Sequence, residues 1–127
     1  MVPGSSAWYD RGFITYSNAA KRAVLGVAAQ TLLAHGAVAE ATVLEMVDGA
    51  LRSSGADHAI AVSGVAGPGG GSPDKPAGTV CIGWGSPGGV REARTFRFDG
   101  DRESVRRQSV VAALEGVIER ALRPASA

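Results

Sequence analysis

The strongest constraint on the fold is a glycine- and proline-rich stretch that lies between two apolar runs. Residues 58–62 are mostly apolar, and residues 64–73 then contain five glycines and two prolines before a second apolar run begins. Glycine lets a ligand approach the backbone closely, and successive N–H groups in such a loop can form an anion-binding concavity. A flexible connection between two strands is the alternative, and it is the usual one for a generic Gly/Pro cluster. The polar residues that flank the stretch favour a ligand site: Ser63, Lys75 and Thr79.

The size and charge of the chain narrow the class of protein. The chain has 127 residues, with 13 Lys plus Arg and 12 Asp plus Glu, for a formal net charge of +1. This length suits a single domain with a real core. The near-zero charge provides no broad basic field, so we expect neither nucleic acid nor a membrane as a partner. No apolar run approaches the roughly 20 residues of a transmembrane helix, and the first residues do not resemble a signal peptide.

The single cysteine and the two histidines do not have the spacing expected of a metal site. Cys81 lies in an apolar run and has no second cysteine to pair with, so we expect a buried structural thiol. His35 and His58 have no partner at the spacing of metal ligands. We therefore expect no metal, no cofactor and a cytoplasmic location, where thiols stay reduced.

The pattern of apolar and helix-breaking residues predicts an α/β fold, a single layered domain of about four strands and about four helices. Strands are expected at residues 12–16, 58–63, 77–84 and 90–98. Helices are expected at residues 19–25, 28–35 and 39–53, followed by a last helix after Asp101. Asn18 is the predicted N-cap of the first helix and Asp101 that of the last. We expect residues 124–127 to be a disordered tail.

Lys21 falls in the first turn of the first predicted helix. The positive end of the helix dipole disfavours a charged amine there, and burial would lower its pKa further. A neutral amine at pH 7 can act as a general base. An exposed, fully charged lysine is the more common case and remains the alternative. The hydroxyls of Tyr16 and Ser17, just before the same helix start, favour the catalytic interpretation.

Three arginines gather at the start of the last predicted helix: Arg102, Arg106 and Arg107. Cations at a helix N-terminus oppose the dipole, so stability alone does not favour them. Their combination with a helix N-terminus suits an anionic ligand such as phosphate. A basic, solvated helix end is the equally weighted alternative.

Several motifs, taken in order, resemble one family closely. They are Pro3-Gly-Ser-Ser-Ala-Trp8, Gly12-Phe-Ile-Thr-Tyr-Ser-Asn-Ala-Ala-Lys21, the His-Gly-Ala-Val core of residues 32–40, Ser63-Gly-Val-Ala-Gly-Pro-Gly-Gly-Gly71, Lys75-Pro-Ala-Gly-Thr-Val80 and Gly100-Asp-Arg102. Together they resemble the C-terminal domain of the CinA (competence/damage-inducible protein A) family. The resemblance covers about residues 3–122 and implies that residues 1–127 form one such domain.

The resemblance also implies an activity. Stand-alone members of the family are amidohydrolases that convert nicotinamide mononucleotide (NMN) to nicotinate mononucleotide and ammonia, a step in bacterial pyridine-nucleotide recycling. Their mechanism is attributed to a metal-free serine–lysine pair. Lys21 matches the family lysine and Tyr16 matches a site tyrosine. The segments that line the nucleotide pocket match these residues: Ser5, Ser6, Ser63, Gly64 and Arg102.

The chain departs from the family pattern at its start. The family domain normally begins with a strand, the motif Ala-Glu-Ser-Cys-Thr-Gly-Gly and a helix, and the serine of that motif would be the nucleophile. Here Met1 falls just before Pro3. We interpret residues 1–6 as a truncated start, from a fragment or a mis-started gene, or as a case in which a nearby hydroxyl substitutes, with Ser6 the first candidate. Loss of a strand and a helix should expose apolar surface and favour a homo-oligomer.

Two functions follow from these residues. The first is hydrolysis of the NMN carboxamide with Lys21, Tyr16 and Ser6 as catalytic residues. The alternative is a truncated, catalytically inactive module in which Ser63, the glycine loop and Arg102 still hold a mononucleotide. The presence of a nucleophile near Lys21 separates the two.

Overall fold

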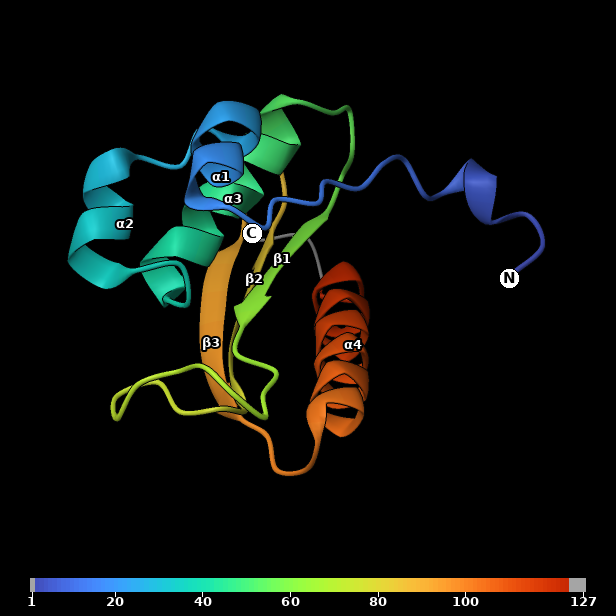
Figure 1. Ribbon diagram of the computed structural model, residues 1–127. Helices are drawn as coiled ribbons and strands as arrows, with labels where there is room; N and C mark the ends of the chain where they lie inside the picture. The colour runs from blue at the N-terminus through green and yellow to red at the C-terminus, as the bar shows by residue number, and fades with distance from the viewer. Residues whose placement is uncertain (1, 124–127) are drawn as a thin grey trace.

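A computed structural model of the chain describes residues 2–123. Its elements are η1 (Ser5–Ala7, a 3₁₀ turn), α1 (Asn18–Leu25), α2 (Ala29–His35), α3 (Glu40–Arg52), β1 (Ala59–Gly64), β2 (Thr79–Gly85), β3 (Arg91–Arg97) and α4 (Arg102–Ala121). The strands form one antiparallel sheet in the order β1–β2–β3. Helices α1 to α3 lie on one face of the sheet and α4 lies on the other (Figure 1). The predicted α/β class is confirmed, and the expected tail at residues 124–127 lies outside the described residues.

Strand β2 is the centre of the sheet and is buried along its whole length. The near-continuous apolar run at residues 77–84 predicted this, since a strand covered on both faces has no polar side. In the register, Cys81 faces Ser63 of β1 on one side and Thr95 of β3 on the other. The glycine-rich stretch therefore connects two neighbouring antiparallel strands, as expected.

Two hydrophobic clusters lie on the two faces of the sheet. The larger one packs α1 to α3 against the sheet, with Val43 and Val47 of α3 completely buried. The smaller one, under α4, surrounds Ile82 and Trp84. Burial of such side chains contributes roughly 1.5–3 kcal/mol each relative to an exposed position, so both helical layers are held by apolar packing.

The contact between α4 and the sheet depends on one small residue. A Cβ atom at Gly116 would lie 2.2 Å from the Trp84 ring, a distance that no real side chain occupies. The indole Nε1 of Trp84 also donates a hydrogen bond to the carbonyl of Ala113 at 3.0 Å. The ring therefore sits directly against the helix backbone, and this pair fixes the position of α4 on the sheet.

The predicted strand at residues 12–16 is wrong. In the described part of the chain this segment has no strand assignment, and no backbone hydrogen bond joins residues 10–16 to the sheet. Its side chains still alternate: Thr15 is buried, whereas Ile14 and Tyr16 are 84% and 92% exposed. β-forming residues become a strand only when a neighbouring strand satisfies their backbone. The sheet accordingly has three strands where about four were expected.

Of the two predicted helix N-caps, one is confirmed and the other is wrong by one residue. Ser17, not the predicted Asn18, caps α1, because the Ser17 hydroxyl accepts from the Ala20 N–H at 2.9 Å. The predicted cap of α4 is confirmed: the Asp101 carboxylate accepts from the Ser104 N–H at 2.9 Å. Serine and asparagine are nearly equal as N-caps, so composition alone could not choose between adjacent residues.

Candidate active site

Lys21 is buried at the start of α1, with 5% of its surface exposed. Its Nζ donates hydrogen bonds to the main-chain carbonyls of Thr15, at 2.5 Å, and of Tyr16, at 3.4 Å. Burial lowers the pKa of the Lys21 amine below its ordinary value, because desolvation penalises the charged form. The alternative of an exposed surface lysine is therefore ruled out.

The two hydrogen bonds of Lys21 leave one position on its nitrogen without a protein partner among the described residues. An ammonium has three N–H donors and no acceptor, and two carbonyls accept from this nitrogen. A neutral amine has two N–H donors and one lone pair, so the two carbonyls would use both donors. The lone pair is then left to accept a proton from a hydroxyl, which is the task of a general base.

The other predicted residues near the N-terminus are held less firmly. The Tyr16 side chain is 92% exposed, and only its carbonyl contacts Lys21. Ser5 and Ser6 belong to the short turn η1, which extends beyond the sheet (Figure 1). Within residues 2–123 no hydroxyl is hydrogen-bonded to the Lys21 amine. The pairing of Ser6 with Lys21 stays a prediction.

The glycine loop begins where β1 ends, at Ser63 and Gly64. The Val65 N–H donates to the Thr79 carbonyl at 2.8 Å, so the loop continues the β1–β2 pairing for one more residue. At its far end Gly78 has φ 95°, and a Cβ there would lie 2.2 Å from the carbonyl oxygen of Phe98. The chain can leave the loop along this path only with glycine at position 78.

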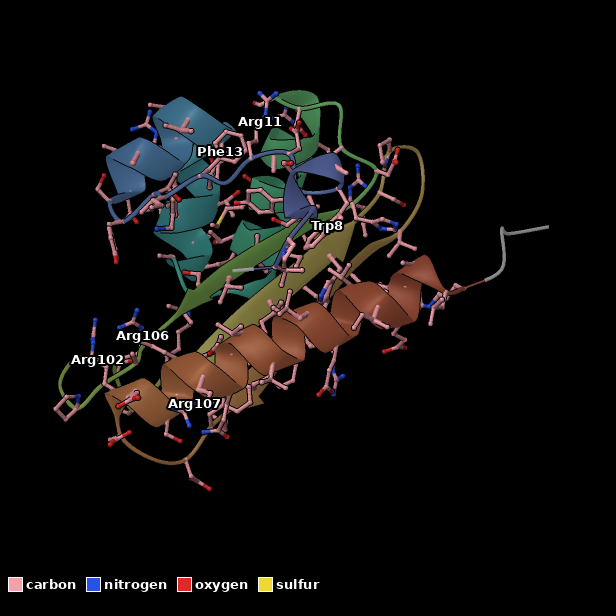
Figure 2. The ribbon with its side chains drawn as sticks, turned by 90° about the vertical axis from the view of Figure 1, so that its right-hand side faces the viewer. Trp8, Arg11, Phe13, Arg102, Arg106 and Arg107 are labelled. Atoms are coloured by element: carbon pink, nitrogen blue, oxygen red, sulfur yellow. The ribbon has the colours of Figure 1, made fainter. Side chains whose placement is uncertain are left out.

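Arg102 links the loop to α4. Its guanidinium donates to the Gly67 carbonyl at 3.2 Å. Figure 2 shows Arg102 and Arg106 on the loop side of α4, whereas Arg107 lies on the other edge of the helix. Arg107 forms an ion pair with Glu103 at 3.2 Å, and among the described residues Arg106 forms none. Two guanidinium groups and a helix N-terminus therefore gather beside the loop, which suits a phosphate.

Lys75, one of the loop-flanking residues, has a structural contact. Its Nζ donates to the His35 carbonyl at the end of α2, where unpaired carbonyls favour a cation. Arg97 of β3 donates to the Asp74 carbonyl at 3.1 Å. These bonds fasten the loop to α2 and β3. The sequence placed Lys75 beside the loop correctly but did not reveal that it binds a helix end.

The two groups of candidate residues lie apart. Figure 1 shows the glycine loop at the end of the sheet where β1 stops and α1 toward the other end. A small cavity of about 20 Å³, lined among others by His58, Trp84 and Arg120, contains none of the predicted residues. It is large enough for one water molecule, whereas ligand pockets measure roughly 300–1,000 Å³.

The described residues contain neither a metal-ligand cluster nor a helix that could span a membrane. Between residues 2 and 123, no three His, Cys, Asp or Glu side chains are grouped as metal ligands would be. No helix in the same part of the chain combines the length and the apolar character needed to cross a membrane. Cys81 is a buried free thiol, as predicted.

Comparisons with known proteins give a consistent result. A sequence profile of the CinA C-terminal domain matches residues 1–121. The nicotinamide-nucleotide amidohydrolase PncC of Pseudomonas putida is 55% identical over 118 residues, which cover 93% of this chain and 73% of that protein. PncC of Escherichia coli K12 is 50% identical over 114 residues, which cover 90% of this chain and 69% of the relative.

Solved structures resemble the fold closely. The competence/damage-inducible protein CihA of Agrobacterium tumefaciens superposes with a TM-score of 0.90 at 46% identity, covering 93% of this chain and 72% of that one. A competence damage-inducible protein A from Klebsiella pneumoniae gives a TM-score of 0.89 at 47% identity, covering 94% and 74% respectively.

Proposed function

This chain belongs to the CinA C-terminal domain family, and we propose on that premise that it hydrolyses the carboxamide of NMN to nicotinate mononucleotide and ammonia. Family membership confirms the resemblance inferred from the sequence motifs. The observation that carries the activity is the high identity to relatives named nicotinamide-nucleotide amidohydrolases. The alternative, an inactive nucleotide-binding module, is not favoured by these relatives.

Lys21 is the general base in the proposed reaction. The neutral amine accepts the proton of an attacking hydroxyl while the hydroxyl oxygen bonds to the amide carbon. The resulting tetrahedral intermediate collapses, the C–N bond breaks, and ammonia leaves with the proton from Lys21. Water then hydrolyses the acyl-enzyme by the same base. The burial of Lys21 and its two carbonyl contacts support this role.

Ser6 is the proposed nucleophile and Tyr16 the proposed third catalytic residue. Both belong to the N-terminal segment that leads to Lys21, and both side chains are exposed. An exposed hydroxyl can contact a substrate, but Ser6 must approach the Lys21 amine to within about 3 Å for proton transfer. The proposal therefore requires η1 to lie against α1 when substrate is bound.

The nucleotide is proposed to bind at the glycine loop. Ser63 and Gly64 offer hydroxyl and backbone groups there, and Arg102 offers a guanidinium for the phosphate. Ser5 is proposed to contact the substrate from η1. The link between Arg102 and the Gly67 carbonyl supports this role, because it holds the cation where loop N–H groups can bind the same anion.

Ammonia release from NMN tests the proposal directly. We expect turnover by the wild-type chain and its loss in Lys21→Met, with NMN binding retained. Arg22→Met is the matched control, because Arg22 is an exposed cation on the same helix. Absence of turnover in a wild-type chain that binds NMN would support the inactive module and would falsify the hydrolase proposal.

Two broader properties are proposed as well. We propose a cytoplasmic location, which the buried free thiol of Cys81 supports, because reduced cysteines persist in that compartment. We also propose a homo-oligomer without nucleic-acid partners. Exposed apolar side chains on the α4 side support the first part, and the net charge of +1 supports the second.

A further inference from the structure

Residues 10–16 form an extended segment, which we call the strap, that leads to the start of α1. Among the described residues, no backbone hydrogen bond joins the strap to another element. Two of its carbonyls, those of Thr15 and Tyr16, nevertheless accept hydrogen bonds from the Lys21 amine. An extended segment without backbone pairing has many conformations open to it. Side-chain contacts must therefore hold these two carbonyls in place.

Arg11 provides the first of these contacts. Its Nη1 donates to the Ser53 carbonyl at 2.7 Å, across 42 residues of chain. Ser53 is the C-cap of α3, and the carbonyls at a helix C-terminus lack intrahelical partners and carry partial negative charge. Asp10 orients the same guanidinium, because its carboxylate accepts from Arg11 Nε at 2.7 Å. A charge-assisted hydrogen bond thus ties the strap to the end of α3.

Phe13 provides the second contact, in the middle of the strap. Its side chain packs against the hydrophobic cluster of helices α1 to α3. Figure 2 shows Arg11 and Phe13 in the layer that these helices form. Apolar packing is non-directional, whereas a hydrogen bond fixes both distance and direction. The contact of Arg11 is therefore the one that determines where the backbone of the strap lies.

Helix α1, which carries Lys21, is attached to α3 independently of the strap. A Cβ atom at Gly49 of α3 would lie 1.9 Å from the Leu25 carbonyl oxygen, so the end of α1 rests directly on the α3 backbone. Arg52 of α3 also donates to the Leu25 carbonyl at 3.4 Å. Helix α3 thus holds Lys21 through α1 and holds the carbonyl partners of Lys21 through Arg11. Loss of the Arg11 contact would release the strap and leave α1 in place.

We propose that Arg11 is a positioning residue for Lys21, because it holds the Thr15 and Tyr16 carbonyls on the amine and the strap over it. The inference rests on the proposed function, in which Lys21 is the general base. Without the Arg11 contact, water reaches the amine and its orientation is no longer fixed. A misplacement of a reacting group by about 1 Å can lower a rate by roughly 100-fold.

The charged groups around Lys21 leave burial as the main influence on its protonation. Among residues 2–123, the Lys21 amine forms no ion pair. Asp10 of the strap is paired with Arg11, and Arg22 of α1 is exposed. The charged side chains of α3, which packs on α1, bind partners other than Lys21: Glu40, Glu45, Asp48 and Arg52. Burial lowers the pKa of Lys21, so this pKa reports whether the strap is in place.

NMR titration measures the pKa of Lys21 directly. The chain contains two lysines, Lys21 and Lys75, so isotope-labelled lysine gives one signal from α1 and one from the loop, and Lys21→Met assigns them. We expect Arg11→Met to raise the Lys21 pKa toward its ordinary value, because water then solvates the charged form. The Lys75 signal should respond to pH as it does in the wild type. Arg11→Lys, which keeps a cationic donor, should restore most of the shift.

Enzyme kinetics provide a second readout. Arg11→Met should lower kcat for NMN roughly 10- to 100-fold at pH 7, with little change in KM, because the loop contacts do not involve the strap. The acidic limb of its pH profile should move to higher pH together with the Lys21 pKa, since the base acts in its deprotonated form. The matched control is Arg22→Met, an arginine next to Lys21 in sequence that is exposed. It should change neither the pKa nor kcat.

The two readouts separate this inference from the proposed function. An unchanged Lys21 pKa in folded Arg11→Met, or an equal shift in Arg22→Met, would overturn the positioning role even in an active enzyme. A chain that releases no ammonia but shows the expected pKa shift would contradict the proposed function and support the role of Arg11. If circular dichroism shows Arg11→Met to be unfolded, Asp10→Asn replaces it. That variant loosens the guanidinium and should raise the Lys21 pKa by a smaller step, and no change would again overturn the inference.

Discussion

The Lys21 region and the glycine-loop region are held in place by different kinds of contact. The loop is fastened by long cationic side chains that reach carbonyls in other elements: Lys75 to α2, Arg97 from β3 and Arg102 from α4. Lys21 instead depends on two carbonyls of an extended segment that pairs with no strand in the described chain. The proposed binding region is thus pre-formed by tertiary contacts, while the geometry of the proposed catalytic region depends on one local segment.

Removal of the Lys21 amine should have the largest effect and should separate the two regions. We expect Lys21→Met to lower kcat for NMN by about 10³-fold, the usual contribution of a positioned base. The affinity for NMN should change little, because the loop contacts do not involve α1. Ammonia assays and calorimetric titration measure the two quantities. Comparable losses in both would show that the regions are not independent.

A side chain at Gly78 should disrupt the loop region specifically. Gly78 has φ 95°, and an added Cβ would meet the Phe98 carbonyl at 2.2 Å, so Gly78→Ala should reduce the free energy of unfolding by about 3 kcal/mol. Gly88→Ala is the matched control: φ is 66° there and nothing lies within 4 Å of the added Cβ. That variant should lose only about 1 kcal/mol, the cost of the left-handed backbone alone. If urea titrations gave equal losses of unfolding free energy for the two variants, the close approach to the Phe98 carbonyl would not be the cause of the destabilisation.

Loss of Arg102 should weaken binding and leave chemistry intact. We expect Arg102→Ala to weaken NMN binding roughly 10- to 100-fold, the value of a charge-assisted hydrogen bond. Nicotinamide riboside, which lacks the phosphate, should bind the variant and the wild type about equally. Competition titrations with both ligands test this. An identical loss for NMN and the riboside would assign Arg102 to the loop structure instead of the phosphate.

The smallest expected effect is a pH dependence of stability. Burial lowers the pKa of Lys21 in the folded chain, whereas the unfolded chain has the ordinary lysine pKa near 10.4. Between these two pKa values the unfolded chain binds more protons, so the free energy of unfolding rises with pH. Each pKa unit by which burial lowers the Lys21 pKa contributes about 1.4 kcal/mol to this rise. Lys21→Met should remove this slope in denaturant titrations at alkaline pH, and Arg22→Met should retain it.

The difference between local features and tertiary contacts also explains which parts of the structure could be predicted from the sequence. The loop and the buried strand β2 were correctly expected, because glycine and a continuous apolar run have local physical meanings. The burial of Lys21 was left open, because its place in a helix start does not determine which side chains pack over it. The segment at residues 12–16 was wrongly predicted to be a strand, because its own sequence does not show whether a neighbouring strand pairs with it. The contact between Lys75 and α2 was missed because residues 35 and 75 are distant in sequence.

The exposed apolar side chains of α4, such as Leu114 and Ile118, show a further limit of sequence reasoning. Exposed apolar surface was expected somewhere, from the departure of the chain from its family pattern. Its location could not be read from the apolar pattern of α4, because Val105 and Val110 look alike in sequence while one is buried and the other is exposed. The position of Trp84 against Gly116 is one of the tertiary contacts that show which side of the helix faces the sheet.

A substitution at Gly116, where α4 touches Trp84, would affect residues far from the contact itself. Gly116 and Arg102 are on the same rigid helix, about 21 Å apart at 1.5 Å per residue. Any side chain at position 116 must displace the indole or lift the helix, and a lifted helix carries the guanidinium away from Gly67. A residue remote from every proposed substrate group therefore controls the position of the proposed phosphate ligand, Arg102. Among natural variants of this domain, changes at the position of Trp84 should accompany changes at the position of Gly116.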